Sequence, residues 1–258
     1  ENNTSGGQAS LYNNTTGGTN TAFGRASMYA NTTGVHNVGV GADALTANTT
    51  GYECTGIGKD ALRDNTTGAH NTAVGRNAGK TITSGGANTF VGHNTNGSPA
   101  VDYAAGLGYN LTCAGFYTTL GYSSVDSRLN HGTTNWVTVS DERYKKDITD
   151  AVAGLSFINA LQPRTFNYKA KGELPTTFRA YEEGSTEVFK DTATQHGFIA
   201  QEVKAAMDAD AGIQDGFKMW SERADGSQEV GDVALIPILV KAIQELSTQN
   251  AALAARLT

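Results

Sequence analysis

The sequence predicts a mixed fold of two unlike parts: a fibrous, repetitive β-roll or β-helix over residues 1–139, and an α+β domain over residues 140–258 that ends in a coiled-coil helix. Three observations lead to this prediction. Residues 1–139 hold 23 of the 31 glycines, but only 6 of the 19 basic and 7 of the 25 acidic residues. A period of 17 residues runs through the glycine-rich part, and the charged part ends in a heptad-like apolar pattern.

The period is set by Asn-Thr-Thr-Gly, which begins at Asn14, Asn31, Asn48 and Asn65. Between these copies lies a short segment that ends in one large apolar residue followed by glycine. A unit this short cannot bury a core alone, so the units must stack on one another. We expect one very short strand per unit, with glycine at turns that need positive φ. The large apolar side chain is expected to point inward in each unit; these residues are Phe23, Val40, Ile57, Val74, Val91, Leu107 and Leu120.

The apolar content of the repeats is thin, which favours burial between chains as well as within them. The repeats resemble the left-handed β-roll of trimeric bacterial adhesin heads and similar repeats in phage fibres, and this resemblance implies a trimer. We interpret the regular threonines as hydrogen-bonding groups of a solvated surface; a face that binds ice or carbohydrate is the alternative. Cys54 and Cys113 lack metal-ligand spacing and are expected to be buried small residues.

Residues 140–258 have the pattern of an ordinary globular domain. Asp150 is expected to cap a helix that carries Val152 and ends at Pro163. The next expected elements are a strand over residues 165–169, a polar hairpin or loop over 171–191, a strand leading into a helix over 196–207, and two pairing strands over 218–222 and 230–234.

The clearest predicted helix covers about residues 237–258, with Pro237 in its first turn. Its apolar residues follow the spacing of the a/d seam of a coiled coil, and Asn250 falls at an a position. A buried polar residue there fixes register and oligomer number. The alternative is an amphipathic helix that packs on its own domain. The seam consists of Leu239, Ile243, Leu246, Asn250, Leu253 and Leu257.

Motifs spread along the second part carry a resemblance to a known family. They are Ser140-Asp-Glu-Arg-Tyr-Lys145 with Ile148, Gly154-Leu155, Leu161-Gln-Pro163, Phe166 with Tyr168, and His196-Gly-Phe-Ile-Ala-Gln-Glu-Val203. In this order, and followed by a terminal helix, they resemble the C-terminal intramolecular chaperone domain of phage tail spikes and tail fibres, such as endosialidase tail spikes. The resemblance implies a domain that trimerises, guides the folding of the β-rich stalk before it and then cleaves itself off.

The resemblance also implies Ser140 as the nucleophile, Lys145 as its base, and a cut at Val139–Ser140. A serine hydroxyl is a weak nucleophile until a base takes its proton, and a lysine can do so where its pKa is lowered. Such Ser-Lys pairs are a known variant of the Ser-His-Asp arrangement. His131 and His196 are alternative bases, and a structural role is the favoured interpretation of both.

Asp141 and Arg143 lie between the expected nucleophile and base, and we expect them to form an ion pair or to hold the turn. The expected enzyme is a serine endopeptidase that acts once, in cis, without a metal or other cofactor. Glu1 is not an initiator methionine, so we expect the chain to be a piece of a longer protein.

The expected protein is a homotrimeric tail fibre or tail spike of a virion, made in the host cytoplasm, whose residues 1–139 are a candidate surface for a host glycan or receptor. The net charge of −6 argues against nucleic acid as a partner, and no apolar run is long enough for membrane insertion. One alternative is a non-catalytic trimeric adhesin, or a glycan- or ice-binding β-roll, with a C-terminal trimerisation module. A polysaccharide-degrading spike is disfavoured because the acids of the repeats form no convincing acid/base pair; these are Asp60, Asp64, Asp102 and Asp126.

Overall fold

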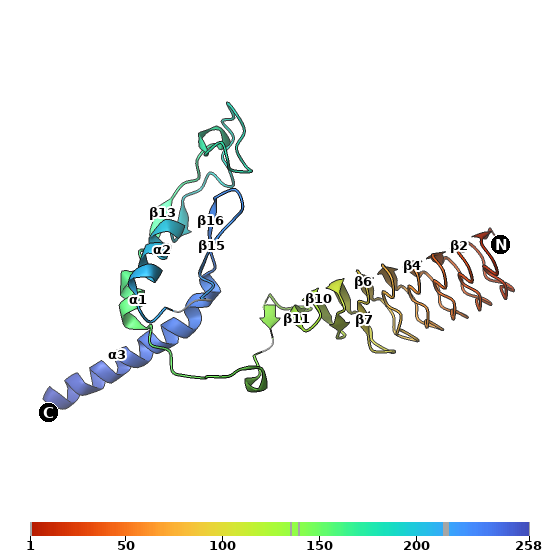
Figure 1. Ribbon diagram of the computed structural model, residues 1–258, viewed down its shortest axis with the longest axis horizontal. Helices are drawn as coiled ribbons and strands as arrows, with labels where there is room; N and C mark the ends of the chain where they lie inside the picture. The colour runs from red at the N-terminus through yellow and green to blue at the C-terminus, as the bar shows by residue number, and fades with distance from the viewer. Residues whose placement is uncertain (1, 135, 139, 214–216, 258) are drawn as a thin grey trace. The chain divides into compact units, whose positions relative to one another are not determined.

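The computed structural model describes residues 2–134, 136–138, 140–213 and 217–257 (Figure 1). The chain forms two compact units, Glu1–Lys145 and Lys146–Thr258, each with its own hydrophobic core. The first unit is a β-solenoid of about seven turns, and the second is an α+β unit with a long C-terminal helix, which confirms the predicted fold class. The expected boundary at residue 140 is defined by the cut and stays a prediction.

One sheet runs the length of the solenoid, and each coil contributes a short parallel strand to it (Figure 1). Thr21 pairs with Val38, and Val38 pairs with Thr55, so one coil equals one 17-residue sequence period. After β10 the chain reverses, and the last two strands join antiparallel. In sheet order the strands are β1 (Thr4–Gly6), β2 (Thr21–Phe23), β3 (Val38–Val40), β4 (Thr55–Ile57), β5 (Thr72–Val74), β6 (Thr89–Val91), β8 (Ala105–Tyr109), β10 (Tyr117–Tyr122), β11 (Val125–Asn130) and β12 (Trp136–Thr138); β7 (Asn96–Gly97) pairs separately with β9 (Thr112–Cys113).

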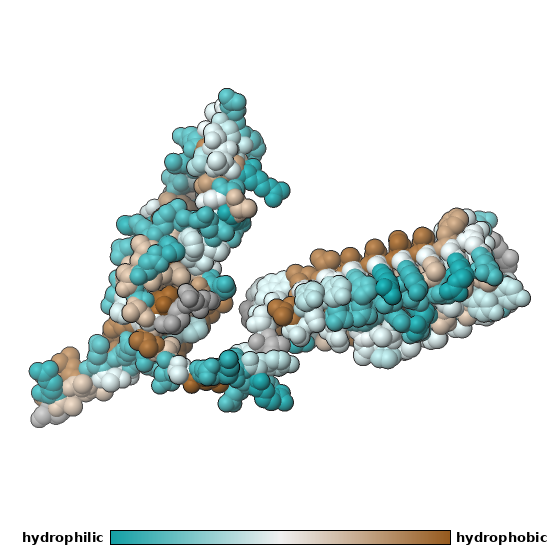
Figure 2. Space-filling view, viewed as in Figure 1, coloured by the Kyte–Doolittle hydropathy of each residue, from teal (hydrophilic) through white to brown (hydrophobic). Residues whose placement is uncertain are grey.

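The large apolar residue of each strand points outward, so the expectation that it faces the core was wrong. Side chains alternate along a strand, and the middle residue is the buried one: Ala22 is fully buried, whereas Phe23 is 46% exposed. In β3 the interior has no room for a larger middle residue, because a Cβ on Gly39 would lie 2.7 Å from Ser27 Oγ, whereas in β6 the buried middle residue is Phe90. We call these outward residues the outward row, and Figure 2 shows a row of hydrophobic residues along the solenoid. The outward row consists of Phe23, Val40, Ile57, Val74, Val91, Leu107 and Leu120.

The core is filled instead by the segment that follows each strand. Met28, Leu45 and Leu62 are fully buried there, one coil apart, and Ile82 and Phe90 extend the same cluster. Fully buried side chains of this size each contribute roughly 1.5–3 kcal/mol through the hydrophobic effect. The narrow solenoid therefore takes its stability from one stacked apolar column.

Two columns of asparagines run beside this apolar column. In the first, Asn31 Nδ2 donates to Asn14 Oδ1 at 2.7 Å, and Asn48 Nδ2 donates to Asn31 Oδ1 at 2.8 Å. In the second, the backbone N–H of Asn37 donates to Asn20 Oδ1 at 2.9 Å. Because an unpaired buried amide is costly, each asparagine of the first column requires its equivalent in the next coil, whereas the second column needs only the next backbone N–H, which Cys54 supplies to Asn37. The requirement in the first column explains why asparagine recurs there at the sequence period.

The first threonine of each Thr-Thr pair is also used in the ladder between coils. Thr15 Oγ1 donates to the carbonyl of Thr32 at 2.8 Å, and Thr32 Oγ1 donates to that of Thr49 at 3.0 Å. For these threonines the structural interpretation is confirmed. Cys54 and Cys113 are buried free thiols, as expected, and burial raises the pKa of each to about 11.

The second unit surrounds a separate core that includes Phe157, Val203, Met219, Leu235 and Ile238. Two antiparallel pairs lie beside its helices: β13 with β14, and β15 with β16. A bridge between Ala170 and Val188 closes the polar loop predicted between the first pair. The elements are α1 (Leu155–Ala160), β13 (Arg164–Phe166), η2 (Lys171–Glu173), β14 (Gln195–Gly197), α2 (Ala200–Ala209), β15 (Trp220–Glu222), β16 (Gln228–Val230), η3 (Asp232–Ala234) and α3 (Leu235–Leu257).

The helix expected from Asp150 begins later, at Leu155, so Asp150 does not cap it. Val152 lies before the helix and is 77% exposed. The backbone N–H of Leu155 instead donates to Glu245 Oε2 on α3, at 2.9 Å. The start of α1 is thus fixed by a carboxylate 90 residues away in the sequence.

The predicted terminal helix is confirmed as α3. Leu235, Ile238 and Ala242 are buried against the rest of the unit. The predicted seam adjoins this buried stripe, since Leu239 and Leu246 each lie four residues after a buried residue, and it is exposed; Ile243, for example, is 64% exposed. The helix therefore packs on its own unit and still leaves the seam open. Within the described residues, no helix is both long and apolar enough to cross a membrane.

Candidate functional site

The candidate site lies where the solenoid sheet ends. β12 pairs with β11 through Leu129 with Trp136 and Ser127 with Thr138. Val139, the residue expected on the other side of the cut, lies outside the described residues. The chain thus leaves an ordered antiparallel strand shortly before the expected nucleophile.

A single 3-10 turn, η1 (Glu142–Tyr144), follows Ser140. Asp141 caps it, because its Oδ1 accepts the backbone N–H of Arg143 at 2.9 Å. The backbone N–H of Lys145 donates to the carbonyl of Glu142 at 2.8 Å and closes the turn. Lys145 itself leaves the turn in an extended conformation, with φ −116° and ψ 151°. The turn thereby folds the chain back toward its own start.

This turn brings the Lys145 side chain onto Ser140: Nζ lies 2.8 Å from Oγ, within hydrogen-bond distance. As an ammonium, Lys145 donates to the hydroxyl; as a neutral amine, it can accept the hydroxyl proton, which is the step that activates a serine. Both residues are exposed in the single chain. The geometry of a Ser-Lys pair therefore forms within six consecutive residues.

The expected ion pair between Asp141 and Arg143 is present. Arg143 Nε donates to Asp141 Oδ1 at 2.9 Å, and Nη2 donates to Oδ2 at 2.6 Å. The hydrogen bonds from Arg143 lower the pKa of Asp141, and the carboxylate in turn raises that of Arg143. The carboxylate between nucleophile and base is thus already fully engaged by a neighbour.

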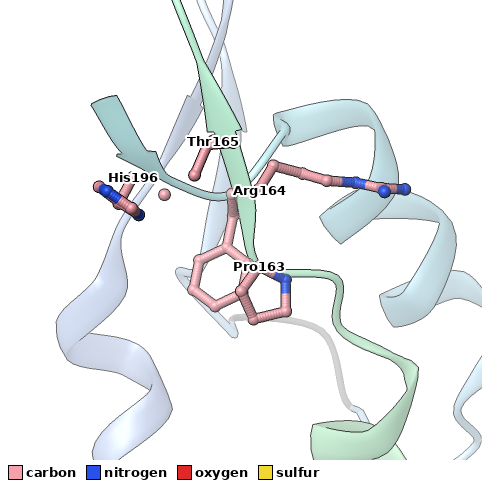
Figure 3. A pocket seen from close by; sticks show the side chains of 6 residues that line it. Pro163, Arg164, Thr165 and His196 are labelled. Atoms are coloured by element: carbon pink, nitrogen blue, oxygen red, sulfur yellow. The ribbon is translucent and has the colours of Figure 1, made fainter. Parts of the chain in front are cut away.

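The two histidines considered as alternative bases have other neighbours. His131 Nε2 lies 3.1 Å from Thr118 Oγ1 at the end of the solenoid. His196 lies on β14 of the second unit, beside a shallow pocket of about 270 Å³ (Figure 3). In Figure 3 the Arg164 side chain extends toward α2, where it binds Glu202 in a bidentate ion pair. Among the described residues, Lys145 is the side chain that hydrogen-bonds Ser140 Oγ.

Two of the solenoid acids lie beside basic neighbours. Asp64 is bound by the adjacent Arg63 at 2.7 Å, and Asp60 lies 3.8 Å from the adjacent Lys59. In the described part of the chain, no cluster of three or more His, Cys, Asp or Glu side chains could hold a metal ion.

Sequence reasoning missed the outward row as a surface feature. The available signal was the order of sizes within each strand, since a small residue precedes the large one, as in Ala22-Phe23 and Gly39-Val40. In a coil with a narrow interior, the small residue is the one that fits inside. That reasoning would have placed the large residue outside.

Comparison with known families gives one match. Residues 140–212 match the family model described as the chaperone of endosialidase, a peptidase family of self-cleaving intramolecular chaperones. The match begins at Ser140 and ends after α2. Together with the β-solenoid before it, this domain fits the chaperone region of a tail spike or tail fibre. No significant match was found among curated proteins or among solved structures.

Proposed function

We propose that this chain is the C-terminal region of a phage tail fibre or tail spike, in which residues 140–258 assemble three chains, guide the folding of the β-solenoid and then cut themselves off. The observation that carries the proposal is the hydrogen bond between Lys145 and Ser140 at the first residue of the family match. The cut falls between Val139 and Ser140, and the enzyme acts once.

The chemistry follows from the position of Ser140 beside the bond to be cut. Ser140 Oγ attacks the carbonyl carbon of Val139, and its proton passes to the neutral Nζ of Lys145. The new Oγ–C bond replaces the C–N bond, and the Ser140 nitrogen leaves as an amine after accepting a proton from the Lys145 ammonium. Water then hydrolyses the ester, releasing the Val139 carboxylate and restoring the Ser140 hydroxyl. No metal or redox partner is required for the balance.

The outward row supports assembly of several chains. Apart from Val91, its side chains are 36–55% exposed in the single chain and follow one another coil after coil along one face of the sheet. A continuous apolar strip of this kind is rare on the surface of a soluble monomer and marks an interaction surface. We propose that it packs against the same strip of two further copies.

The seam of α3 supports the same oligomer at the other end of the chain. Leu239, Leu246 and Leu253 are 41–55% exposed at heptad spacing, beside the stripe that α3 buries in its own unit. Three helices joined along this seam would bring the three stalk chains to a high effective concentration. Asn250 then sits inside the seam, where it selects one register.

Cutting has a physical purpose in such an assembly. Strand pairing across three chains folds slowly and is prone to error, so a helical template helps it. Once the template has been removed, an unfolded stalk refolds only slowly, so the assembled fibre is kinetically trapped. Because Ser140 and Lys145 are exposed in the single chain, burial by neighbouring chains would favour the neutral amine only after assembly.

The test compares wild type with Ser140→Ala and Lys145→Ala on denaturing gels, with mass spectrometry of the fragments and sedimentation velocity of the native proteins. We expect wild type to give two fragments joined at Val139–Ser140, and both variants to remain intact as trimers. Ser156→Ala, at another exposed serine, is the matched control and should be cut like wild type. Cleavage in Lys145→Ala at the wild-type rate, or an intact wild-type chain, would overturn the self-cleaving function.

One observation favours a second candidate. Beside the outward row, the first strand positions carry a parallel row of threonines, including Thr21, Thr55 and Thr72, on the same flat sheet face. A flat, regular array of threonine and aliphatic side chains is also suited to bind ice or a repeating glycan. This function needs the face to be open, so a monomer or a trimer joined only by α3 that retards ice growth would favour it.

A further inference from the structure

The turn between Ser140 and Lys145 carries charged side chains besides the proposed base, and one of them is the carboxylate of Asp141. Asp141 lies next to the nucleophile and four residues before the base, close enough in this short turn for its carboxylate to compete with Ser140 for the Lys145 side chain. An Asp141–Lys145 pair would hold Lys145 as an ammonium, which cannot take a proton. The arrangement of Asp141 therefore matters to the proposed chemistry.

Two other lysines of this chain show what the spacing permits. Lys204 binds Asp208, and Lys241 lies 3.9 Å from Glu245, each pair being four residues apart on a helix. Lys145 instead hydrogen-bonds Ser140. Asp141 is still near enough that the charge of Lys145 contributes to its lowered pKa, after the larger effect of Arg143.

Those pairs lie on helices, whereas Asp141 and Lys145 are extended residues on either side of a 3-10 turn, and in this turn Arg143 occupies the Asp141 carboxylate. The backbone N–H and Nε of Arg143 both donate to Asp141 Oδ1, and its Nη2 donates to Oδ2, so both carboxylate oxygens are occupied. The guanidinium also offsets the negative charge that Lys145 would otherwise experience. A lysine at position 143 could not reproduce this, since it offers no planar fork of donors.

We propose that Arg143 is a positioning residue for self-cleavage: by engaging the Asp141 carboxylate, it keeps Lys145 on Ser140 and favours the neutral amine. This inference rests on the proposed function of the Ser140–Lys145 pair. Arg143 acts through Asp141 and touches neither reacting atom.

The other charges around Lys145 come from its own segment. Glu142, Lys146 and Asp147 are sequence neighbours, and all are exposed. In the described part of the chain, no charged group of another element forms an ion pair or hydrogen bond with η1. Asp141 is thus the one acid of the turn that a defined contact holds away from Lys145.

Asp141 has two separable roles, which makes the inference testable. Its side chain caps the turn, and its negative charge would favour the ammonium form of Lys145, which cannot act as a base. Asparagine caps as well as aspartate and has no charge, so Asp141→Asn keeps the first role and removes the second. The informative set is therefore Arg143→Ala, Asp141→Asn and the double variant Asp141→Asn with Arg143→Ala.

The experiment uses the full chain, purified denatured, refolded and assembled at pH 5.5, and then shifted to pH values from 6 to 9.5 while cleavage is followed on gels. For Arg143→Ala we expect the rising limb of the rate–pH profile to move up by about half a unit to one unit. Cleavage at pH 7 should then be slower by about three- to tenfold, and near the wild-type rate at the top of the range. The double variant should return the limb to the wild-type position or below.

Glu142→Gln is the matched control, because it removes a negative charge from the same turn without touching the ion pair of Asp141. The rising limb of the rate–pH profile of Glu142→Gln should stay within a few tenths of a pH unit of the wild-type position. If Arg143 only held the shape of the turn, Arg143→Ala would be slower by the same factor at every pH, and the double variant would not recover. A pH-independent slowing of Arg143→Ala overturns the inference, and so does a double variant that does not recover. A shift of the Glu142→Gln limb as large as the recovery in the double variant would overturn it too.

The same cleavage measurements distinguish failure of the proposed function from failure of the role assigned to Arg143. If wild type is not cut, or if Lys145→Ala is cut like wild type, the Ser-Lys mechanism itself is wrong. If Lys145→Ala is inactive and Arg143→Ala keeps the wild-type limb, the mechanism stands and only the role of Arg143 is refuted. Circular dichroism and sedimentation of each variant in the Ser140→Ala background identify any failure to fold or assemble.

Discussion

Aspartate in place of Ile57 is predicted to weaken the association of the solenoids without unfolding the single chain. Ile57 is 40% exposed, so completing its burial between chains contributes about 1 kcal/mol per chain. An aspartate there would forgo that contribution and add an unpaired charge in an apolar interface, at about 3–5 kcal/mol. Over three chains the loss is on the order of 10 kcal/mol. Within one chain the same change costs only about 1–2 kcal/mol, because the position is already partly open to water.

The assay is urea-induced dissociation of the full chain in the Ser140→Ala background, followed by sedimentation velocity, with circular dichroism as the measure of the solenoid fold. Thr50→Asp, at an exposed position on a different face of the coil, is the matched control. We expect Ile57→Asp to dissociate at a clearly lower urea concentration than Thr50→Asp, with both chains still folded in buffer. Equal resistance would refute the interface, and a chain that loses its β signal even without urea would show that Ile57 belongs to the core.

Three further outcomes are expected. Leu62→Ala should destabilise the solenoid by about 3–5 kcal/mol in chemical denaturation, since it empties a fully buried site; a loss below about 1 kcal/mol would contradict the stacked core. Because burial raises the pKa of Cys54 and Cys113 to about 11, only about one thiol in a thousand is a thiolate at pH 8, and a disulfide reagent should react slowly until the chain is denatured. The Ser227 hydroxyl is the main cause that lowers the pKa of Asp225 to about 2, so this carboxylate stabilises the second unit above pH 4 and the effect is lost as pH falls toward 2; Asp225→Asn should remove that part of the acid dependence of unfolding.

The stacked solenoid could be predicted from the sequence because its period is visible in the sequence itself. Asn14, Asn31 and Asn48 recur at a fixed distance, and residues at a fixed distance become neighbours when coils stack. The direction in which Phe23 and Val40 point could not be derived from the period. A three-residue strand shows no repeated alternation, so only the small size of the interior decides which residue is inside.

The start of α1 was predicted wrongly for a different reason. Asp150 was a reasonable cap by local rules, but Glu245 supplies the carboxylate that the helix start uses. That contact depends on how α3 packs on α1, which no local pattern contains. The turn around Ser140 is the opposite case: all its determinants lie within six residues, and the expected ion pair between Asp141 and Arg143 is found.

The antiparallel end of the solenoid sheet has a consequence for how the three chains of the proposed trimer would align. From β1 to β6 the coils are nearly equivalent, so one chain could slide past another by a whole coil and lose only the contacts of the end coils. Such translational degeneracy gives a set of misaligned states with almost the correct energy. The reversal at β11 and β12 breaks the repeat and gives every chain a distinguishable end. Because the proposed cut follows β12, the reference point that defines the alignment would stay with the fibre after the chaperone has gone.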